Sequence, residues 1–177
     1  MTEAFFQRYR VDDRGALAQR VAILTARLAE AVKTGHQAEE LKLRNELGFD
    51  LTPLDRESEA VAVLEPALEL ARHLGKREVE IEVLLSLATA RQYLGEREIA
   101  QELFREALEK SATYGIDEHT NFILHHQGRC YAEQGDLASA RRCFEQALEL
   151  RRKIGKPRFI ESAQRALATL DEMERAT

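Results

Sequence analysis

Glycine recurs along this sequence at a fixed spacing of 40 residues. Seven of the nine glycines form two lines in the same register: Gly35, Gly75, Gly115 and Gly155; and Gly15, Gly95 and Gly135. Asp55 occupies the place where the second line lacks a glycine. A fixed period of this length is typical of repeat proteins, in which each repeat is one supersecondary unit that packs against its neighbours.

Apolar and small residues follow the same period. The lines are Leu24, Leu64, Phe104 and Phe144; Leu28, Leu68, Leu108 and Leu148; Ala60, Ala100 and Ala140; Ala67, Ala107 and Ala147; and Gly48, Ala88, Gly128 and Ala168. Within each repeat the apolar residues are three and four apart, which predicts amphipathic helices, and the glycines predict where each helix ends. We therefore expect helices at residues 2–11, 14–34, 37–52, 57–74, 77–94, 97–114, 118–134, 137–154 and 158–175.

Three further signals concern individual helices. Asp55, Asp117 and Pro157 stand close to predicted helix starts, where such residues are common. Pro66 lies inside the helix predicted at 57–74 and should kink it near Ala62. The kink would either open a groove or only bend the stack of helices.

The composition limits the class of protein. Apolar residues make up 44% of the 177 residues and charged residues 32%, so a packed core is expected. No apolar run approaches the roughly 20 residues that a bilayer requires, and the N-terminus lacks the features of a secretory signal, so we expect a cytoplasmic protein without membrane partners. The net charge of −5 argues against general binding of nucleic acid.

Catalytic and metal-binding patterns are not evident. The five histidines lack the spacing that places two ligands on one helical face, and no phosphate-binding loop or nucleophile motif occurs. Cys130 and Cys143 lack metal-type spacing and are predicted to be small buried or half-buried thiols. We therefore expect no enzyme activity, no metal and no cofactor.

The periodic residues resemble the tetratricopeptide repeat. The similarity is most specific at Leu124, Gly128, Tyr131, Gly135, Ala140, Phe144 and Ala147, and the 40-residue period resembles the longer-helix variety found in kinesin light chains and in bacterial regulators. This resemblance implies an all-α fold, a right-handed α-solenoid of about four helical hairpins with a C-terminal capping helix. We expect one domain over residues 1–177, with repeats at approximately 1–40, 41–80, 81–120 and 121–160 and the cap at 158–175.

The resemblance also implies a binding function. Members of the family bind proteins or peptides, and the first helix of each hairpin lines the concave face. By register, the predicted ligand-contacting residues are Asn45, Phe49, Thr52, Leu85, Thr89, Gln92, Phe122, His125, Arg129, Glu133 and Arg165. The alternative is structural: Phe49 and Phe122 pack into neighbouring helices and the polar residues are only solvated. A non-catalytic adaptor or scaffold is the predicted function, and a peptide-sensing module that acts through a partner is a further alternative.

The distribution of charge raises the possibility of self-association. Residues 36–82 carry twelve acids against six bases, whereas residues 141–158 carry seven bases against two acids. Opposite charge at two places in the chain allows head-to-tail contact between copies, as does the aromatic segment with Phe5, Phe6 and Tyr9, which can instead fold onto its own chain. A structural homo-oligomer that assembles through its terminal helices is therefore the second predicted function.

Overall fold

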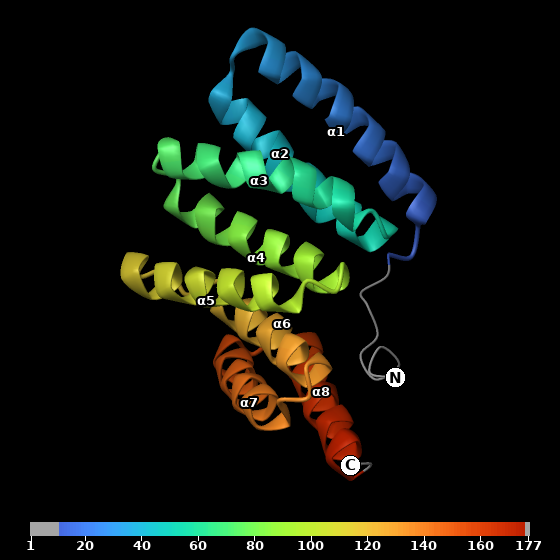
Figure 1. Cartoon of the computed structure of the whole chain (residues 1–177), viewed down its shortest axis with the longest axis vertical. Helices are drawn as coiled ribbons and strands as arrows, with labels where there is room; N and C mark the ends of the chain where they lie inside the picture. Colours follow the sequence, from blue (N-terminus) through green and yellow to red (C-terminus); the bar gives the residue numbers. More distant parts are fainter. Residues whose placement is uncertain (1–10, 176–177) are drawn as a thin grey trace. The chain divides into compact units, whose positions relative to one another are not determined.

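The computed structural model describes residues 11–175, and within these it contains eight α-helices, one short 3-10 turn and no strand. In chain order (Figure 1) the elements are α1 (Arg14–Thr34), α2 (Gln37–Leu51), the turn η2 (Thr52–Leu54), α3 (Glu57–His73), α4 (Arg77–Tyr93), α5 (Arg97–Tyr114), α6 (Thr120–Glu133), α7 (Leu137–Ile154) and α8 (Pro157–Arg175). The predicted helix bounds agree with these to within two or three residues. Residues 2–10 of the helix predicted at 2–11, which include Phe5, Phe6 and Tyr9, lie outside the described residues.

The described chain divides into two compact units, residues 11–99 and residues 100–175, which we call the N-terminal and C-terminal units. In the N-terminal unit, α1 packs against α2, α2 against α3 and α3 against α4, and α2 also contacts α4. In the C-terminal unit, α7 packs against both α6 and α8, and α6 also contacts α8. Successive helices thus pack together from α1 to α4 and from α6 to α8, which confirms the predicted all-α fold of stacked hairpins. The prediction of a single domain over residues 1–177 stays a prediction.

The left-handed turns follow the two glycine lines. Gly35, Gly75, Gly95, Gly115, Gly135 and Gly155 all have positive φ, and so does Asp55, with φ 61°. The helix preceding each of these residues ends there because glycine takes this conformation without the steric cost of a Cβ atom. Gly15 departs from the prediction, since it is the second residue of α1 and lies in a helix. Its place on the glycine line therefore does not mark a helix end.

Two other glycines allow neighbouring helices to approach closely. A Cβ atom added to Gly48 in α2 would lie 2.3 Å from Cγ of Leu64 in α3, and one added to Gly128 in α6 would lie 2.9 Å from Cε1 of Phe144 in α7. Leu64 and Phe144 are completely buried. The small residue on one helix thus packs against the large residue on the next helix, and the same contact occurs in both units.

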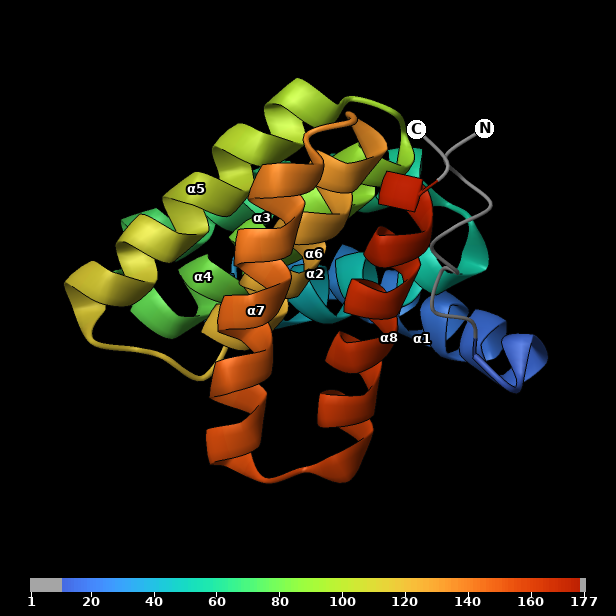
Figure 2. The ribbon, with the colours of Figure 1, turned by 90° about the horizontal axis from the view of Figure 1, so that it is seen from below.

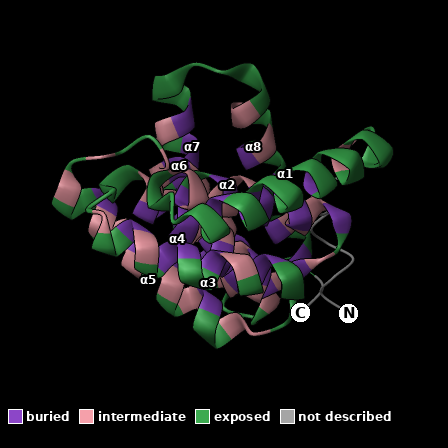
Figure 3. Ribbon diagram, turned by 90° about the horizontal axis from the view of Figure 1, so that it is seen from above, coloured by how far each residue is buried: buried purple, intermediate pink, exposed green. Residues whose placement is uncertain are grey.

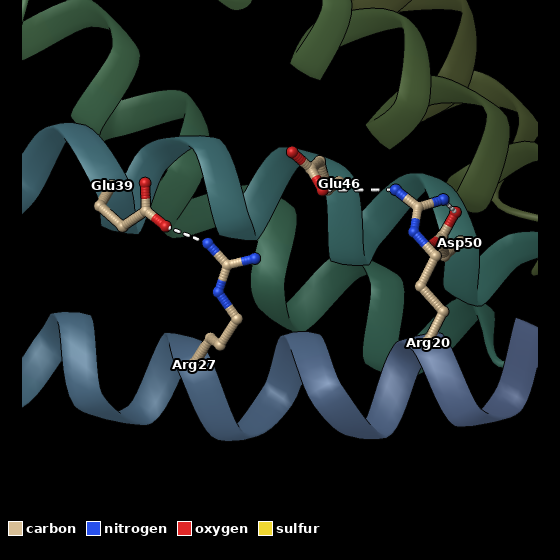
Figure 4. A network of polar contacts seen from close by, with 5 residues as sticks. All are labelled: Arg20, Arg27, Glu39, Glu46 and Asp50. Atoms are coloured by element: carbon tan, nitrogen blue, oxygen red, sulfur yellow. Dashed lines mark hydrogen bonds and ion pairs between the residues drawn. The ribbon is translucent and has the colours of Figure 1, made fainter.

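Polar contacts join α1 to α2 along their length (Figure 4). Arg20 bonds the Oδ1 atom of Asp50 at 3.0 Å and the Oε2 atom of Glu46 at 3.3 Å, and Arg27 bonds Glu39 at 2.5 Å. Arg14 extends this seam beyond the end of α2, where it donates to the carbonyl oxygens of Pro53 and Leu54, both at 3.0 Å. These arginines lie at increasing positions in α1 and contact residues at decreasing positions after it, so the two helices are antiparallel.

The helix starts only partly follow the predicted signals. Pro157 begins α8 as expected, but Asp55 has a left-handed backbone and pairs with Arg14, and α6 begins three residues after Asp117. Asp13 and Asp136 cap instead, since their side chains accept from the backbone N–H groups of Ala16 and Ser139. Pro66 lies inside α3, which continues through it to His73. No helix among the described residues is long and apolar enough to cross a membrane.

The close contact at Gly48 gives a stability prediction. Gly48→Ala should lower the free energy of unfolding by about 1–3 kcal/mol, because the added methyl group collides with buried Leu64, even though alanine favours a helix. Gly15→Ala is the matched control, since that glycine lies in the first turn of α1 and its nearest neighbour would be 3.3 Å away. Urea denaturation followed by circular dichroism measures both, and equal stability of the two variants would contradict the packing argument.

Candidate ligand-binding face

In the N-terminal unit, a side-chain bridge joins the first helices of two successive repeats. The Nδ2 atom of Asn45 in α2 donates to the Oε2 atom of Glu82 in α4 at 2.8 Å. The carboxylate of Glu82 and the amide of Asn45 are both only half-buried. The bridge therefore fixes two helices relative to each other while it remains accessible from solvent. We call the surface formed by Asn45, Phe49, Thr52, Glu82, Leu85 and Thr89 the α2–α4 face.

Phe49 is the most exposed large side chain of this face. It lies four residues after Asn45 in α2, on the same side of the helix, and 62% of it is accessible. Thr52, Leu85 and Thr89 are half-buried. The hydroxyl of Thr52 donates to the carbonyl oxygen of Gly48 in α2 at 3.4 Å, and that of Thr89 to the carbonyl oxygen of Leu85 at 2.8 Å. The result is an exposed aromatic ring beside a short row of apolar and hydroxyl groups, a mixture typical of peptide-binding surfaces.

Gln92, which the family register places among the ligand-contacting residues, is only 1% exposed. It lies in the last turn of α4, seven residues after Leu85. Leu85 and Thr89 thus remain half-buried, whereas Gln92 on the same helix is buried.

In the C-terminal unit, two of the predicted residues, Phe122 and His125, lie against a buried arginine, Arg151, near the end of α7. Its Nε atom donates to Oδ1 of Asn121 at 3.1 Å and its Nη1 atom to the carbonyl oxygen of Phe159 at 3.2 Å. The guanidinium carbon lies 5.7 Å from the ring centroid of Phe122 and 5.9 Å from that of Phe159. Arg151 is 3% exposed, and its partners are neutral, so it joins α6, α7 and α8 by neutral hydrogen bonds and ring contacts.

The two phenylalanines of the predicted site therefore behave differently. Phe122 packs edge-to-face on Phe159 with 5.1 Å between ring centroids, as the structural alternative expects, whereas Phe49 remains exposed, as the binding interpretation requires. On the sequence alone, Arg151 is only one of the seven bases counted in residues 141–158. A signal was present, because Arg151 follows Phe144, Ala147 and Leu148 at the spacing of the apolar stripe.

The remaining predicted residues of this unit are His125, Arg129, Glu133 and Arg165. His125 is half-buried, 3.4 Å from Nη1 of Arg151 through Nδ1, and its ring lies 5.5 Å from that of Phe144. Arg129 donates to Glu133 at 2.9 Å, and both side chains are at most 10% exposed. Arg165 is exposed on α8. Phe122 and His125 thus meet at Arg151, whereas Arg129 and Glu133 pair with each other.

Burial and positive charge keep two histidines neutral in this region. The pKa of His126 is lowered to about 4, mainly by burial and then by the charges of Arg129 and Arg151, and the pKa of His125 is well below its ordinary value for the same main reason. Burial also lowers the pKa of Arg151 to about 10 and raises that of Cys143 to about 11. Cys130 and Cys143 are both buried thiols outside any disulfide, in line with the prediction, and the raised pKa makes Cys143 a weak nucleophile.

Comparison with known families identifies one repeat of the chain. The tetratricopeptide repeat family model matches residues 122–154, the region of α6 and α7. Residues 122–154 form a tetratricopeptide repeat. The resemblance expected from the periodic residues is thereby confirmed, and it is most specific in the part of the chain where the family model matches.

Solved tetratricopeptide structures have the same fold over most of the chain. The TPR-like repeats of a protein described as a kinesin light chain from Podosopora anserina, solved in two forms, match with TM-scores of 0.71 and 0.66. Their identities are 22% and 21%, and they cover 92% and 90% of this chain and 82% and 88% of those chains. The TPR domain of Arabidopsis FLU matches with a TM-score of 0.64 at 21% identity, over 66% of this chain and 98% of that one. None of the curated proteins matches the sequence.

The buried arginine of the tetratricopeptide repeat allows a test with an adjacent control. Arg151→Met should lower the free energy of unfolding by about 1–3 kcal/mol, because it leaves the buried Asn121 amide oxygen and the Phe159 carbonyl without their donor. Arg152→Met changes the next residue, which is exposed, and should alter stability by at most about 0.5 kcal/mol. Thermal and urea unfolding measure the difference, and equal values would show that the arginine contacts contribute nothing.

The lowered pKa of His126 predicts acid sensitivity. Because an unfolded histidine has a pKa near 6.5 and folded His126 about 4, the unfolded chain binds more protons between these values. The stability is therefore fully present above about pH 6.5 and falls as the pH drops toward 4, by up to roughly 3 kcal/mol from this residue. His126→Phe should flatten the dependence of the unfolding free energy on pH, whereas His73→Gln, at an exposed position, should leave it unchanged. Parallel pH profiles of wild type and His126→Phe would contradict this assignment.

Proposed function

We propose that this chain is a non-catalytic binding protein that holds a peptide, or an extended segment of another protein, on the α2–α4 face. The fold supports interaction with proteins in general, and the choice of this face depends on one observation. Phe49 exposes 62% of a large aromatic side chain next to the bridge between Asn45 and Glu82. Exposed aromatic residues beside fixed polar groups are the usual anchors of protein interfaces.

The polar groups of the face define what a ligand would meet. Glu82 is a half-buried carboxylate, and a carboxylate offers about four acceptor positions on its two oxygens, so a ligand N–H group or a basic side chain can donate to it beside the Asn45 amide. Leu85 offers apolar area beside it. The ligand that fits best therefore carries an apolar side chain for Phe49 and Leu85 and a donor for Glu82.

The other predicted residues remain part of the proposal with a secondary role. Phe122, His125 and Arg165 belong to the C-terminal unit, where the first two also contribute to the contacts of Arg151. Gln92, Arg129 and Glu133 are buried or paired and would reach a ligand only after a local rearrangement. A cytoplasmic adaptor or scaffold, and a sensing module that acts through a partner, are both compatible with such a face.

A selection from a library of random 12-residue peptides, displayed on phage, provides a probe for this proposal. Selected peptides should bind the wild type and lose at least about tenfold in affinity with Phe49→Ala, because a central aromatic anchor is worth more than about 1.4 kcal/mol. Fluorescence anisotropy with labelled peptides measures the affinities.

Ile23→Ala is the matched control. Ile23 lies on α1, outside the α2–α4 face, and is 61% exposed, nearly the same as Phe49. Its removal should change peptide affinity by less than about twofold. Peptides that bind both variants equally well would exclude the α2–α4 face, and a library that yields no binder would remove the support for peptide binding.

A further inference from the structure

The turn between α7 and α8 carries a concentrated positive charge. Residues 152–158, which we call the basic corner, contain Arg152, Lys153, Lys156 and Arg158 and no acidic residue. Figure 2 shows α7 and α8 side by side with the turn at their common end. All seven residues of the basic corner are exposed (Figure 3). Ile154 lies among the four cations and is 45% exposed.

Contacts within the described part of the chain account for only part of this charge. The Nζ atom of Lys156 lies over the ring of Phe159, 5.5 Å from its centroid, and one of the four cations has an ion pair. Lys153 pairs with Glu149 at 2.8 Å, with both side chains more than 60% exposed, whereas Arg152, Lys156 and Arg158 form no ion pair with any described residue. Arg152 and Lys153 suit the end of α7, where the helix dipole favours positive charge. Lys156 and Arg158 stand at the start of α8, where the dipole disfavours it. The two cations at the start of α8 therefore lower the stability of the free chain, and an acidic partner would offset this unfavourable electrostatic energy.

The N-terminal unit contains a surface of opposite character. An open hollow of about 640 Å³ is lined by the apolar residues Ala62, Pro66, Leu68 and Leu87 and by the carboxylates Glu65 and Glu69. Ala62, Glu65, Pro66 and Glu69 are exposed. Pro66, which was predicted either to open a groove or only to bend the stack of helices, lines this hollow. The hollow is large enough for a branched apolar side chain of the size of isoleucine.

The charge around the hollow is negative. Arg72 bonds two carboxylates, Glu69 at 3.1 Å and Glu80 at 3.4 Å, and Arg91 likewise bonds both Glu65 and Glu96. Each arginine is thus shared by two acids, so these six groups together carry a net charge of −2. Glu69 is 77% exposed and Glu65 53%, so part of each carboxylate remains accessible to a cation from a partner.

We infer that the basic corner of one copy of this chain docks at the acidic hollow of a second copy, with Ile154 in the hollow and Lys156 and Arg158 beside Glu65 and Glu69. Apolar contact surrounded by complementary charge is the usual composition of a specific interface. The partner is a second copy because the chain itself supplies both halves of the contact. A polyanion such as nucleic acid would meet the cations but leave Ile154 without an apolar partner, and the chain's net charge of −5 opposes it.

The two surfaces differ, so the contact is heterologous. Every copy that uses its corner still presents a free hollow, and the assembly grows with concentration unless a ring closes. The contact is small and partly ionic, so we expect weak association that increases at low ionic strength. This inference is independent of the peptide-binding proposal, because neither surface includes the α2–α4 face.

Sedimentation velocity of the full chain tests the inference with two complementary variants. The corner variant Ile154→Ser/Lys156→Ser/Arg158→Ser removes the apolar side chain and two cations, and the hollow variant Ala62→Tyr fills the hollow from an exposed helix position. From about 1 to about 500 µM, the wild type should increase in mass, and each variant should associate at least about tenfold more weakly. Circular dichroism checks that both remain helical.

An equimolar mixture of the two variants makes the result specific. The hollow variant keeps an intact corner and the corner variant an intact hollow, so the mixture should form heterodimers and nothing larger. Ile23→Ser/Lys33→Ser removes an exposed apolar residue and an exposed cation from α1 and should associate like the wild type.

Three outcomes would overturn the inference: a wild type that stays monomeric over the whole range, association that both variants retain, or a mixture that contains only monomers. Binding of selected peptides to the corner variant shows separately whether the α2–α4 face works. A failure of one proposal is therefore distinguishable from a failure of the other.

Discussion

The close approach of paired helices at a small residue is the constraint on which the rest of this structure depends. Leu64 packs against Gly48 in α2, and Phe144 packs against Gly128 in α6, at distances that leave no room for a methyl group. The two pairs lie 80 residues apart in the chain, at the same place of the 40-residue period. A hairpin packed so tightly has one rotational setting, and this setting decides which side of the first helix faces away from its partner.

Phe49 directly follows Gly48, and successive residues of a helix differ by about 100° in direction, so its side chain points to one side of the contact with Leu64. Asn45, four residues before Phe49, points in nearly the same direction and reaches α4 through Glu82. The neighbours in each repeat decide the burial of this position, because Phe49 is exposed, whereas Arg129, which follows Gly128 in the same way, is buried and pairs with Glu133. The helix packing and the surface proposed to bind a ligand therefore lie on adjacent sides of α2.

The sequence predicted the helices well because their ends depend on local chemistry. The left-handed conformation at the glycine lines and at Asp55 is a property of single residues, and it gave the helix ends within a few positions. Gly15 failed because a glycine in a helix is only mildly unfavourable, and the capping oxygen of Asp13 fixes the start of α1 instead. Asp117 did not mark the start of a helix either, since α6 begins three residues later at Thr120, after His119, whose side chain makes no capping hydrogen bond.

The site was less predictable because it depends on contacts between helices distant in sequence. The bridge from Asn45 to Glu82 spans 37 residues, and that from Arg151 to Asn121 spans 30, so no local pattern reveals either. Whether a charged residue serves the fold or a partner is decided by what surrounds it. Arg151 and Arg141 have the same side chain on α7, but the first is buried with neutral acceptors and the second is shared by Asp171 and Glu174. Both arginines bond to residues of neighbouring helices. At the basic corner, Arg152, Lys156 and Arg158 form no ion pair with a described residue, and Lys156 and Arg158 stand where the helix dipole opposes them. Cations that contribute so little to the stability of their own fold are the ones from which a contact with a partner can be inferred.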